Sequence, residues 1–291
     1  MSIPRKHHFL PQFYQRRWTV DGELTVFRRF PSGLSVLRRA PAAVGFVSDL
    51  YSNPSDEDEE RRQLLESRFF KAVDNEAALA LNYMEDEKSP PSCQRKRSAW
   101  ARFLMSLMHR SPGRIRRLHR EAHGERERII GSVRENRPEA QNLSDGQILG
   151  SEDLDILYLN LVQDLVNSTH IGTHLVGMTW AIISFNFGNH SLLSSDRPLV
   201  RSSGVRGEAA FLILPISPNA CFVAANHDKV LDYFSKLSSK NLSMLINNAV
   251  VKQAEEFVIS VDESQARFID NRLLRTELSR DSLGDVTWAM T

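Results

Sequence analysis

Cysteine is scarce in this chain, with Cys93 and Cys221 the only two among 291 residues. They lie far apart and form no Cys-x-x-Cys pair, which argues against a disulfide scaffold and a zinc knuckle and favours a reducing compartment. No apolar run approaches the roughly 20 residues that a membrane-spanning helix needs. The basic residues near the N-terminus are not followed by the apolar segment of a secretory signal. We therefore expect a cytoplasmic protein without a membrane partner.

Several well-known catalytic signatures are also lacking. The sequence has no Gly-rich phosphate loop, no Gly-x-Ser-x-Gly elbow and no cysteine–histidine nucleophile pattern. These absences argue against nucleotide hydrolysis by a P-loop and against the common hydrolase and kinase chemistries.

Charge of each sign is concentrated in separate segments, although the formal net charge is only +1. Residues 95–137 contain 12 arginines and one lysine against four glutamates, whereas residues 49–88 contain 12 acids against five bases. Guanidinium groups bind phosphate in a fork that ammonium groups cannot match, so the basic segment favours a nucleic-acid partner. The plainer alternative is that acidic and basic helices of one domain neutralise each other.

Strand patterns lie at both ends of the chain, and helical patterns lie between them. Alternating apolar residues on either side of Pro31-Ser32-Gly33 predict a β-hairpin over 23–39. Helical spacing then continues to residue 178, followed by short β-rich runs separated by turn residues. This order predicts an α+β fold, with a mixed or antiparallel sheet built from N- and C-terminal strands and a central helical bundle. We assign residues 1–55 to the hairpin region, 56–178 to the bundle and 179–291 to a C-terminal α+β region, within one compact domain.

The opening run His7-His8-Phe9-Leu10-Pro11-Gln12-Phe13-Tyr14 is the most informative motif. Histidine is the side chain that titrates near neutral pH and the commonest metal ligand. The following proline suits the first turn of a helix. Adjacent residues of a strand point to opposite sides, so we expect one imidazole to act and the other to be held by the core or by a carboxylate.

Several segments together resemble a large family known as domain of unknown function 4238. The opening run resembles the His-His-x-x-Pro-x-x-Tyr signature of its members. Trp180, an apolar stretch and Ser195-Asp196-Arg197-Pro198 resemble its Trp…Ser-Asp-x-Pro motif. Shorter elements match Asp49-Leu50-Tyr51, Glu66 and Arg110-Ser111-Pro112, whereas Gln15-Arg16-Arg17-Trp18 departs from the usual Leu-x-x-Phe. The resemblance covers nearly the whole chain and implies no particular reaction.

We expect His7, His8, Tyr14 and Asp196 to form a catalytic site, provided that the two ends of the chain meet. A His–Asp pair fixes the tautomer and orientation of the imidazole. With Tyr14 nearby, it suits general acid–base catalysis on a phosphodiester, as in metal-independent ribonucleases.

Two alternatives stay open at this point. The same groups suit a divalent metal ion, with His8, Asp49, Glu66 and Asp196 as candidate ligands. Alternatively, the histidines bond to buried backbone groups, and Ser195 and Asp196 form a turn before Pro198.

The candidate substrate-binding residues are Gln12, Arg110, Arg114 and Arg117. Arg114 and His119, with four residues between them, resemble the pair used by HEPN-type ribonucleases. A segment this rich in arginine also matches so short a pattern by chance, which is the explanation that we favour.

These observations predict a nucleic-acid-processing enzyme, with RNA the favoured substrate and a role in bacterial defence or as a toxin suggested by class analogy. The alternative is a ligand- or partner-binding module that hydrolyses nothing. The sequence leaves open whether a divalent metal ion is needed and whether the chain forms a homo-oligomer.

Overall fold

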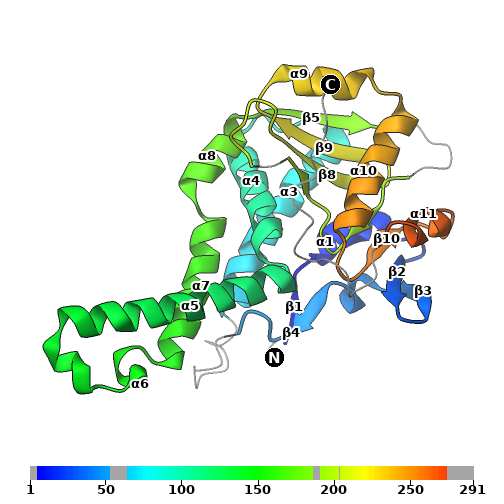
Figure 1. Cartoon of the computed structure of the whole chain (residues 1–291). Helices are drawn as coiled ribbons and strands as arrows, with labels where there is room; N and C mark the ends of the chain where they lie inside the picture. The colour runs from blue at the N-terminus through cyan, green and yellow to red at the C-terminus, as the bar shows by residue number, and fades with distance from the viewer. Residues whose placement is uncertain (1–4, 53–63, 186–190, 203, 274–291) are drawn as a thin grey trace.

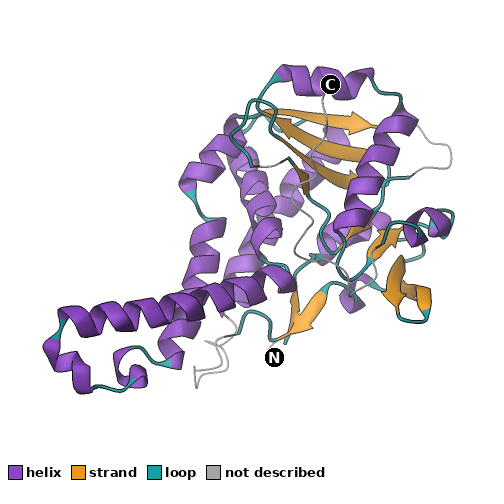
Figure 2. Ribbon diagram, in the orientation of Figure 1, coloured by secondary structure: helices purple, strands orange, loops and turns teal. Residues whose placement is uncertain are grey.

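A computed structural model describes residues 5–52, 64–185, 191–202 and 204–273. Strands lie toward both ends of the chain and helices fill the middle, so the fold is α+β, as the sequence predicts (Figure 1). Figure 2 shows the strands gathered on one side of the molecule, while long helices extend away from them. Within the described ranges, no helix combines the length and apolarity needed to span a bilayer.

The two ends of the chain meet in one four-stranded antiparallel sheet. The predicted hairpin is formed by β2 (Leu24–Phe30) and β3 (Gly33–Arg39). Strand β2 also pairs with β10 (Val258–Ser260), which in turn pairs with β6 (Ser194–Ser195). The order is therefore β3-β2-β10-β6, and the predicted pairing of N- and C-terminal strands is confirmed.

A second antiparallel sheet comes from the C-terminal region alone, so the strands do not form the single sheet that the sequence suggested. Its order is β5 (Thr179–Ser184), β9 (Ala220–Ala225), β8 (Phe211–Ser217) and β7 (Val200–Arg201). Every residue of β8 and β9 is buried, which explains why both read as continuous apolar runs rather than as alternating ones.

Alternate residues of these strands pack on opposite sides. Leu212 and Phe222 belong to one core cluster with Trp100 of α4, whereas Ile213 belongs to another with Ile246 of α10. Figure 1 accordingly shows α10 on one side of the sheet and α4 on the other. The larger cluster also contains side chains of the N-terminal region, so a continuous core joins the three segments distinguished in the sequence.

The middle of the chain is helical, as expected. Its main helices are α3 (Lys71–Glu87), α4 (Gln94–His109), α5 (Pro112–Asn136), α7 (Ser151–Val166) and α8 (Thr169–Gly177). Figure 1 shows α5 and α7 running away from the sheets as an arm, with α6 (Asp145–Ile148) at its far end. The C-terminal region adds α9 (Asp228–Lys236), α10 (Ser239–Gln253) and α11 (Ala266–Asp270).

Two short elements position the opening histidines. Strand β1 (Lys6–His8) pairs with β4 (Phe46–Ser48). The chain then enters α1 (Gln12–Gln15) directly after Pro11, as that proline predicts. Facing β1, the segment Leu65–Phe70 forms a π-helix that leads into α3.

Candidate functional site

Five polar side chains from five elements gather at and beside β1. They are His8 of β1, Gln12 of α1, Glu66 of the π-helix, Asp74 of α3 and Arg110, the residue that ends α4. We call this group the Arg110 cluster. Direct contacts or electrostatic interactions link its members. Arg110 is at the centre of the cluster, because it interacts with Asp74, His8 and Glu66.

Arg110 is fully buried, which is exceptional for an arginine. Its Nε donates to the carbonyl of Phe9 at 2.8 Å, and its Nη1 donates to Asp74 Oδ1 at 2.8 Å. The guanidinium also lies over the ring of Phe70, 5.5 Å from its centroid. Its Nη2 is buried and has no hydrogen-bond partner among the described residues. A buried donor left unpaired is costly, so Nη2 is a candidate contact for a ligand.

Glu66 lies in the first turn of the π-helix, a conformation that is rare and often found at functional sites. Its Oε1 accepts a hydrogen bond from the backbone N–H of His8 at 3.4 Å, and its Oε2 is buried without a partner in the described part of the chain. Burial raises the pKa of Glu66 to about 7; the charge of Arg110 opposes this shift and that of Asp74 adds to it. Glu66 is therefore a carboxyl group that exchanges a proton near neutral pH.

His8 has the opposite perturbation. Burial and the nearby positive charge of Arg110 lower its pKa to about 4, so the imidazole is neutral at neutral pH. The Gln12 amide nitrogen lies 3.4 Å from His8 Nε2, and an amide nitrogen can only donate. Nε2 is therefore the unprotonated nitrogen of the neutral imidazole, the atom at which His8 would accept a proton in place of the hydrogen bond from Gln12.

His7 points to the other side of β1 and is fully buried. Its Nδ1 accepts a hydrogen bond from the backbone N–H of Tyr51 at 2.9 Å, and the two rings stack 5.6 Å apart. The Tyr51 hydroxyl donates to the carbonyl of Arg110 at 2.5 Å. The structure thus places His7 in the packing that supports Arg110, and His8 in the cluster itself.

Tyr14 and Asp196, the other two expected catalytic residues, lie outside the cluster. The Tyr14 hydroxyl is buried, donates to the carbonyl of Pro215 at 2.8 Å and lies 3.1 Å from Ser194 Oγ. It therefore ties α1 to the strands of the C-terminal region, where it has no free position for a substrate.

The Asp196 carboxylate accepts hydrogen bonds from the backbone N–H groups of Glu255 at 3.0 Å and Phe257 at 3.3 Å. It holds the segment that enters β10, and its expected pairing with His8 is not seen in the described chain. A buried carboxylate satisfied by backbone donors is a common structural element. Burial also raises its pKa to about 7.

The four metal-ligand candidates do not converge. Asp49 pairs with Arg5 at 2.6 Å, and Asp196 faces the backbone before β10, so only His8 and Glu66 lie together. Among the residues that the structure describes, no three His, Cys, Asp or Glu side chains form a group that could hold a metal ion.

The substrate-binding candidates divide in the same way. Gln12 and Arg110 belong to the cluster, whereas Arg117 pairs with Glu121 at 2.8 Å and Arg114 lies 3.9 Å from the same carboxylate. The HEPN-like pair is not assembled, because residues five apart point about 140° from each other around a helix. His119 instead packs edge-on against Tyr158, with ring centroids 5.7 Å apart.

Sequence reasoning missed Asp74, and it grouped Glu66 with His8 only as candidate ligands of a metal ion. Asp74 follows Glu66 by eight residues, a spacing that returns close to the same helical face. That periodicity was the only sequence signal available for it, because an aspartate on an amphipathic helix ordinarily faces solvent.

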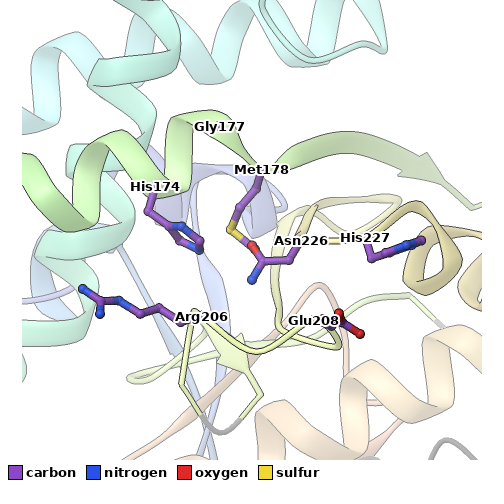
Figure 3. Close-up of a pocket in the computed structure, with 7 residues that line it drawn as sticks. All are labelled: His174, Gly177, Met178, Arg206, Glu208, Asn226 and His227. Carbon is purple, nitrogen blue, oxygen red and sulfur yellow. The ribbon is translucent and has the colours of Figure 1, made fainter.

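A separate cavity of about 410 Å³ lies between α8 and the strands of the second sheet (Figure 3). His174 Nε2 lies 2.7 Å from the carbonyl of Val205, and the Asn226 amide donates to the carbonyls of Val205 and Gly207. Figure 3 shows the Arg206 and His227 side chains pointing to opposite sides. These polar groups tether the loop around Val205 and do not converge on one point where a ligand could bind.

Comparison with known proteins identifies the family. No curated protein and no solved structure matches the chain. The model of a family described as "Protein of unknown function (DUF4238)" matches residues 6–264, a range that includes every member of the Arg110 cluster. The chain therefore belongs to this family.

Proposed function

We propose that this protein is a nucleic-acid-processing enzyme that cleaves RNA, with His8, Glu66 and Arg110 as the groups that act on the phosphodiester. One observation carries the proposal. The carboxyl group of Glu66, whose pKa is raised, accepts a hydrogen bond from the backbone N–H of His8, whose imidazole has a lowered pKa. Both groups feel the charge of the buried Arg110 guanidinium, which has an unused donor. Neighbouring titratable groups whose pKa values are pushed apart are typical of an acid and a base in catalysis.

The two groups suit transphosphorylation by the RNA itself. Neutral His8 takes the proton of the 2′-hydroxyl as that oxygen attacks phosphorus, and protonated Glu66 gives its proton to the departing 5′-oxygen as the P–O bond breaks. The products are a 2′,3′-cyclic phosphate and a free 5′-hydroxyl. Exchange with water then returns His8 and Glu66 to their starting protonation states.

Arg110 supplies a positive charge for the negative phosphate. Its Nη1 and Nε are fixed by Asp74 and Phe9, so the guanidinium is held in place before any substrate binds. Nη2 is then available to donate to a non-bridging phosphate oxygen, and a charge-assisted bond of this kind strengthens as charge develops in the transition state. The negative phosphate also raises the pKa of His8 and favours its protonation during the reaction.

The surroundings support a nucleic-acid substrate and an intracellular setting. Helix α5, which is rich in arginine, begins two residues after Arg110. Cys93 and Cys221 are both unpaired, which fits a cytoplasmic location. A role in defence or as a toxin is proposed on class analogy alone.

The second candidate is a binding module that cleaves nothing. Glu66 Oε2 and Arg110 Nη2 also suit a ligand that offers one donor and one acceptor. This alternative predicts retention of the ligand without turnover.

Cleavage assays separate the two. Purified protein is incubated with total RNA and with DNA, in EDTA and in divalent metal ions, as wild type and as Glu66→Gln and His8→Ala. We expect cyclic phosphate ends from RNA, intact DNA, and a loss of about 10²-fold or more in either variant, the range for removing a general acid or base.

Matched controls are Glu76→Gln, whose side chain is 42% exposed and paired with Arg95, and His170→Gln, an exposed histidine of α8. Both should cleave RNA at the wild-type rate. No cleavage by the wild type under any of these conditions would overturn the enzyme proposal, and ligand retention that Glu66→Gln abolishes would then favour the binding module.

A further inference from the structure

A second cavity, of about 430 Å³, lies against α5 on the arm of the molecule. Its lining includes Arg116, His119 and Arg120 of α5, Tyr158 of α7, and Leu50 and Ser52 from the segment that follows β4. None of these residues belongs to the Arg110 cluster. We call this space the α5 cavity.

The two arginines that line the α5 cavity differ from the other arginines of α5 in their partners. Helix α5 carries seven arginines, and five of them contact a carboxylate or a backbone carbonyl. Those five are Arg114 and Arg117 (both with Glu121), Arg126 (Leu149 carbonyl), Arg128 (Glu125) and Arg134 (Asp145).

The remaining two, Arg116 and Arg120, are exposed and have no hydrogen-bond or ion-pair partner among the described residues. They lie one helical turn apart, so their guanidinium groups can reach the same anion. Both line the α5 cavity, and no described acidic side chain lines it with them. The two arginines of α5 that have no partner in the described part of the chain therefore face the same open pocket, which indicates a binding site for an anion.

The rest of the lining indicates what kind of anion. Tyr158 and Ile115 supply buried apolar surface, and His119 packs edge-on against the Tyr158 ring. Flat aromatic and aliphatic surfaces bind nucleobases by stacking, a contact that inorganic anions do not make. The volume falls within the range of small-ligand sites.

We infer that the α5 cavity binds a nucleotide, with its phosphate between Arg116 and Arg120 and its base against Tyr158 and Ile115. The nucleotide comes either free in solution or as one unit of a single-stranded RNA. The inference stands apart from the proposed function, because binding here needs neither His8 nor Glu66.

The wall of the α5 cavity is nevertheless connected to residues that support the Arg110 cluster. Leu50 accepts a hydrogen bond from the Tyr158 hydroxyl, and the next residue, Tyr51, bonds to His7 and to the carbonyl of Arg110. A strand of RNA held in the α5 cavity would thus lie against a segment that also supports Arg110.

Binding is measured by calorimetry with three probes: AMP, inorganic phosphate and a labelled 2′-O-methyl oligoadenylate, which lacks the hydroxyl that cleavage would need. The test variant is Arg116→Gln/Arg120→Gln, and the control is Arg95→Gln/Arg128→Gln, which removes two exposed arginines that already have glutamate partners. We expect AMP to bind at least tenfold tighter than phosphate, and the test variant to lose at least tenfold for AMP while the control keeps the wild-type value.

Salt dependence and a cluster variant complete the design. Loss of the two arginines that hold one phosphate should reduce the slope of log K against log salt for the oligonucleotide by about 0.7. Glu66→Gln should bind AMP normally, so a failure of the catalytic proposal leaves this result unchanged. If the oligonucleotide binds more tightly than AMP, the natural ligand is one unit of a single-stranded RNA rather than a free nucleotide. The inference would be overturned if neither AMP nor the oligonucleotide bound, or if phosphate bound as tightly as AMP. It would also be overturned if the test and control variants lost affinity equally.

Discussion

Glu66 accepts a hydrogen bond from the backbone N–H of His8, a residue 58 positions earlier in the chain, while its second carboxylate oxygen is buried without a partner in the described structure. This contact joins the π-helix before α3 to strand β1. It also links a carboxyl group with a raised pKa to the backbone of a residue whose imidazole has a lowered pKa. The predictions below test what that arrangement does to stability and to chemistry.

The stability of the protein should depend on the ionisation of Glu66. Burial raises its pKa from 4.5 to about 7, so between these values the folded chain holds a proton that the unfolded chain has released. The associated stability is complete below pH 4.5 and is lost as pH rises through 7, by up to about 3 kcal/mol. Glu66→Gln removes this dependence, so the variant should gain stability relative to wild type as pH increases.

Urea unfolding between pH 4.5 and 8 measures this difference. Comparing variant with wild type cancels the opposite contribution of His8, whose lowered pKa makes stability fall as pH drops from 6.5 toward 4. The surface variant Glu76→Gln should show no such gain. Parallel pH profiles for Glu66→Gln and wild type would show that Glu66 does not titrate as its burial implies.

RNA cleavage should have a bell-shaped pH dependence. The base, His8, must be unprotonated and the acid, Glu66, must be protonated, so kcat/KM should rise through about pH 4 and fall through about pH 7. A fluorogenic RNA assayed from pH 3.5 to 9 gives the profile. A rate that keeps rising through pH 7 would contradict the assignment of Glu66 as the acid.

Breaking the buried pair of Arg110 and Asp74 should destabilise the fold strongly. Arg110→Met leaves the Asp74 carboxylate and the Phe9 carbonyl without their donor, and uncompensated buried charges of this kind cost about 3 kcal/mol or more. The double variant Arg110→Met/Asp74→Leu should recover much of that loss, because it removes both charges together. Denaturant unfolding of both variants checks this, and strictly additive losses would show that the two side chains do not stabilise each other.

Asp196 should contribute to folding rather than to chemistry. In Asp196→Asn, one acceptor oxygen is replaced by an NH2 group, which cannot accept a hydrogen bond from the backbone N–H groups of Glu255 and Phe257. The variant should therefore lose about 2 kcal/mol of unfolding free energy. Its kcat/KM per folded molecule should equal that of the wild type. A folded Asp196→Asn protein without activity would return this carboxylate to the catalytic set.

The turn before β4 should tolerate only glycine. Gly45 has a φ of +68°, and a Cβ there would lie 2.9 Å from Leu10 Cβ. Gly22 has a similar φ of +78° with nothing within 4 Å of a Cβ, so it isolates the backbone strain from the clash. Gly22→Ala should cost about 1 kcal/mol, and Gly45→Ala at least about 1 kcal/mol more by overpacking, as measured by thermal unfolding. Equal losses would mean that Leu10 moves aside freely.

Local sequence patterns determine much of this architecture. Alternation around Pro31-Ser32-Gly33 specifies the β2–β3 hairpin, because side chains of a strand face opposite sides in turn. The prolines at 90, 91 and 112 mark where helices start and stop, since proline removes a backbone donor and fixes φ. Even the meeting of the two chain ends follows from strand patterns that need partners.

Local sequence patterns predict less of the candidate site. Asp196 lies in a distinctive motif, but the sequence does not tell whether its carboxylate faces an imidazole or three successive backbone N–H groups. Asp74 looks like any polar residue of an amphipathic helix until Arg110, 36 residues later, is buried against it. The π-helix that brings Glu66 toward β1 has no periodicity of its own that would separate it from an α-helix.

The sequence by itself determined the α+β class, the hairpin, the helical middle and the opposite orientations of two neighbouring histidines, because each follows from short-range stereochemistry. Only the tertiary structure decided that Glu66 and Arg110, rather than Asp196 and Tyr14, accompany His8, and that Arg116 and Arg120 face a cavity while Arg114 and Arg117 share Glu121. Residues one position apart on a helix point about 100° from each other. Which of them meets a partner therefore depends on how the helices pack, and that packing is set by the whole core.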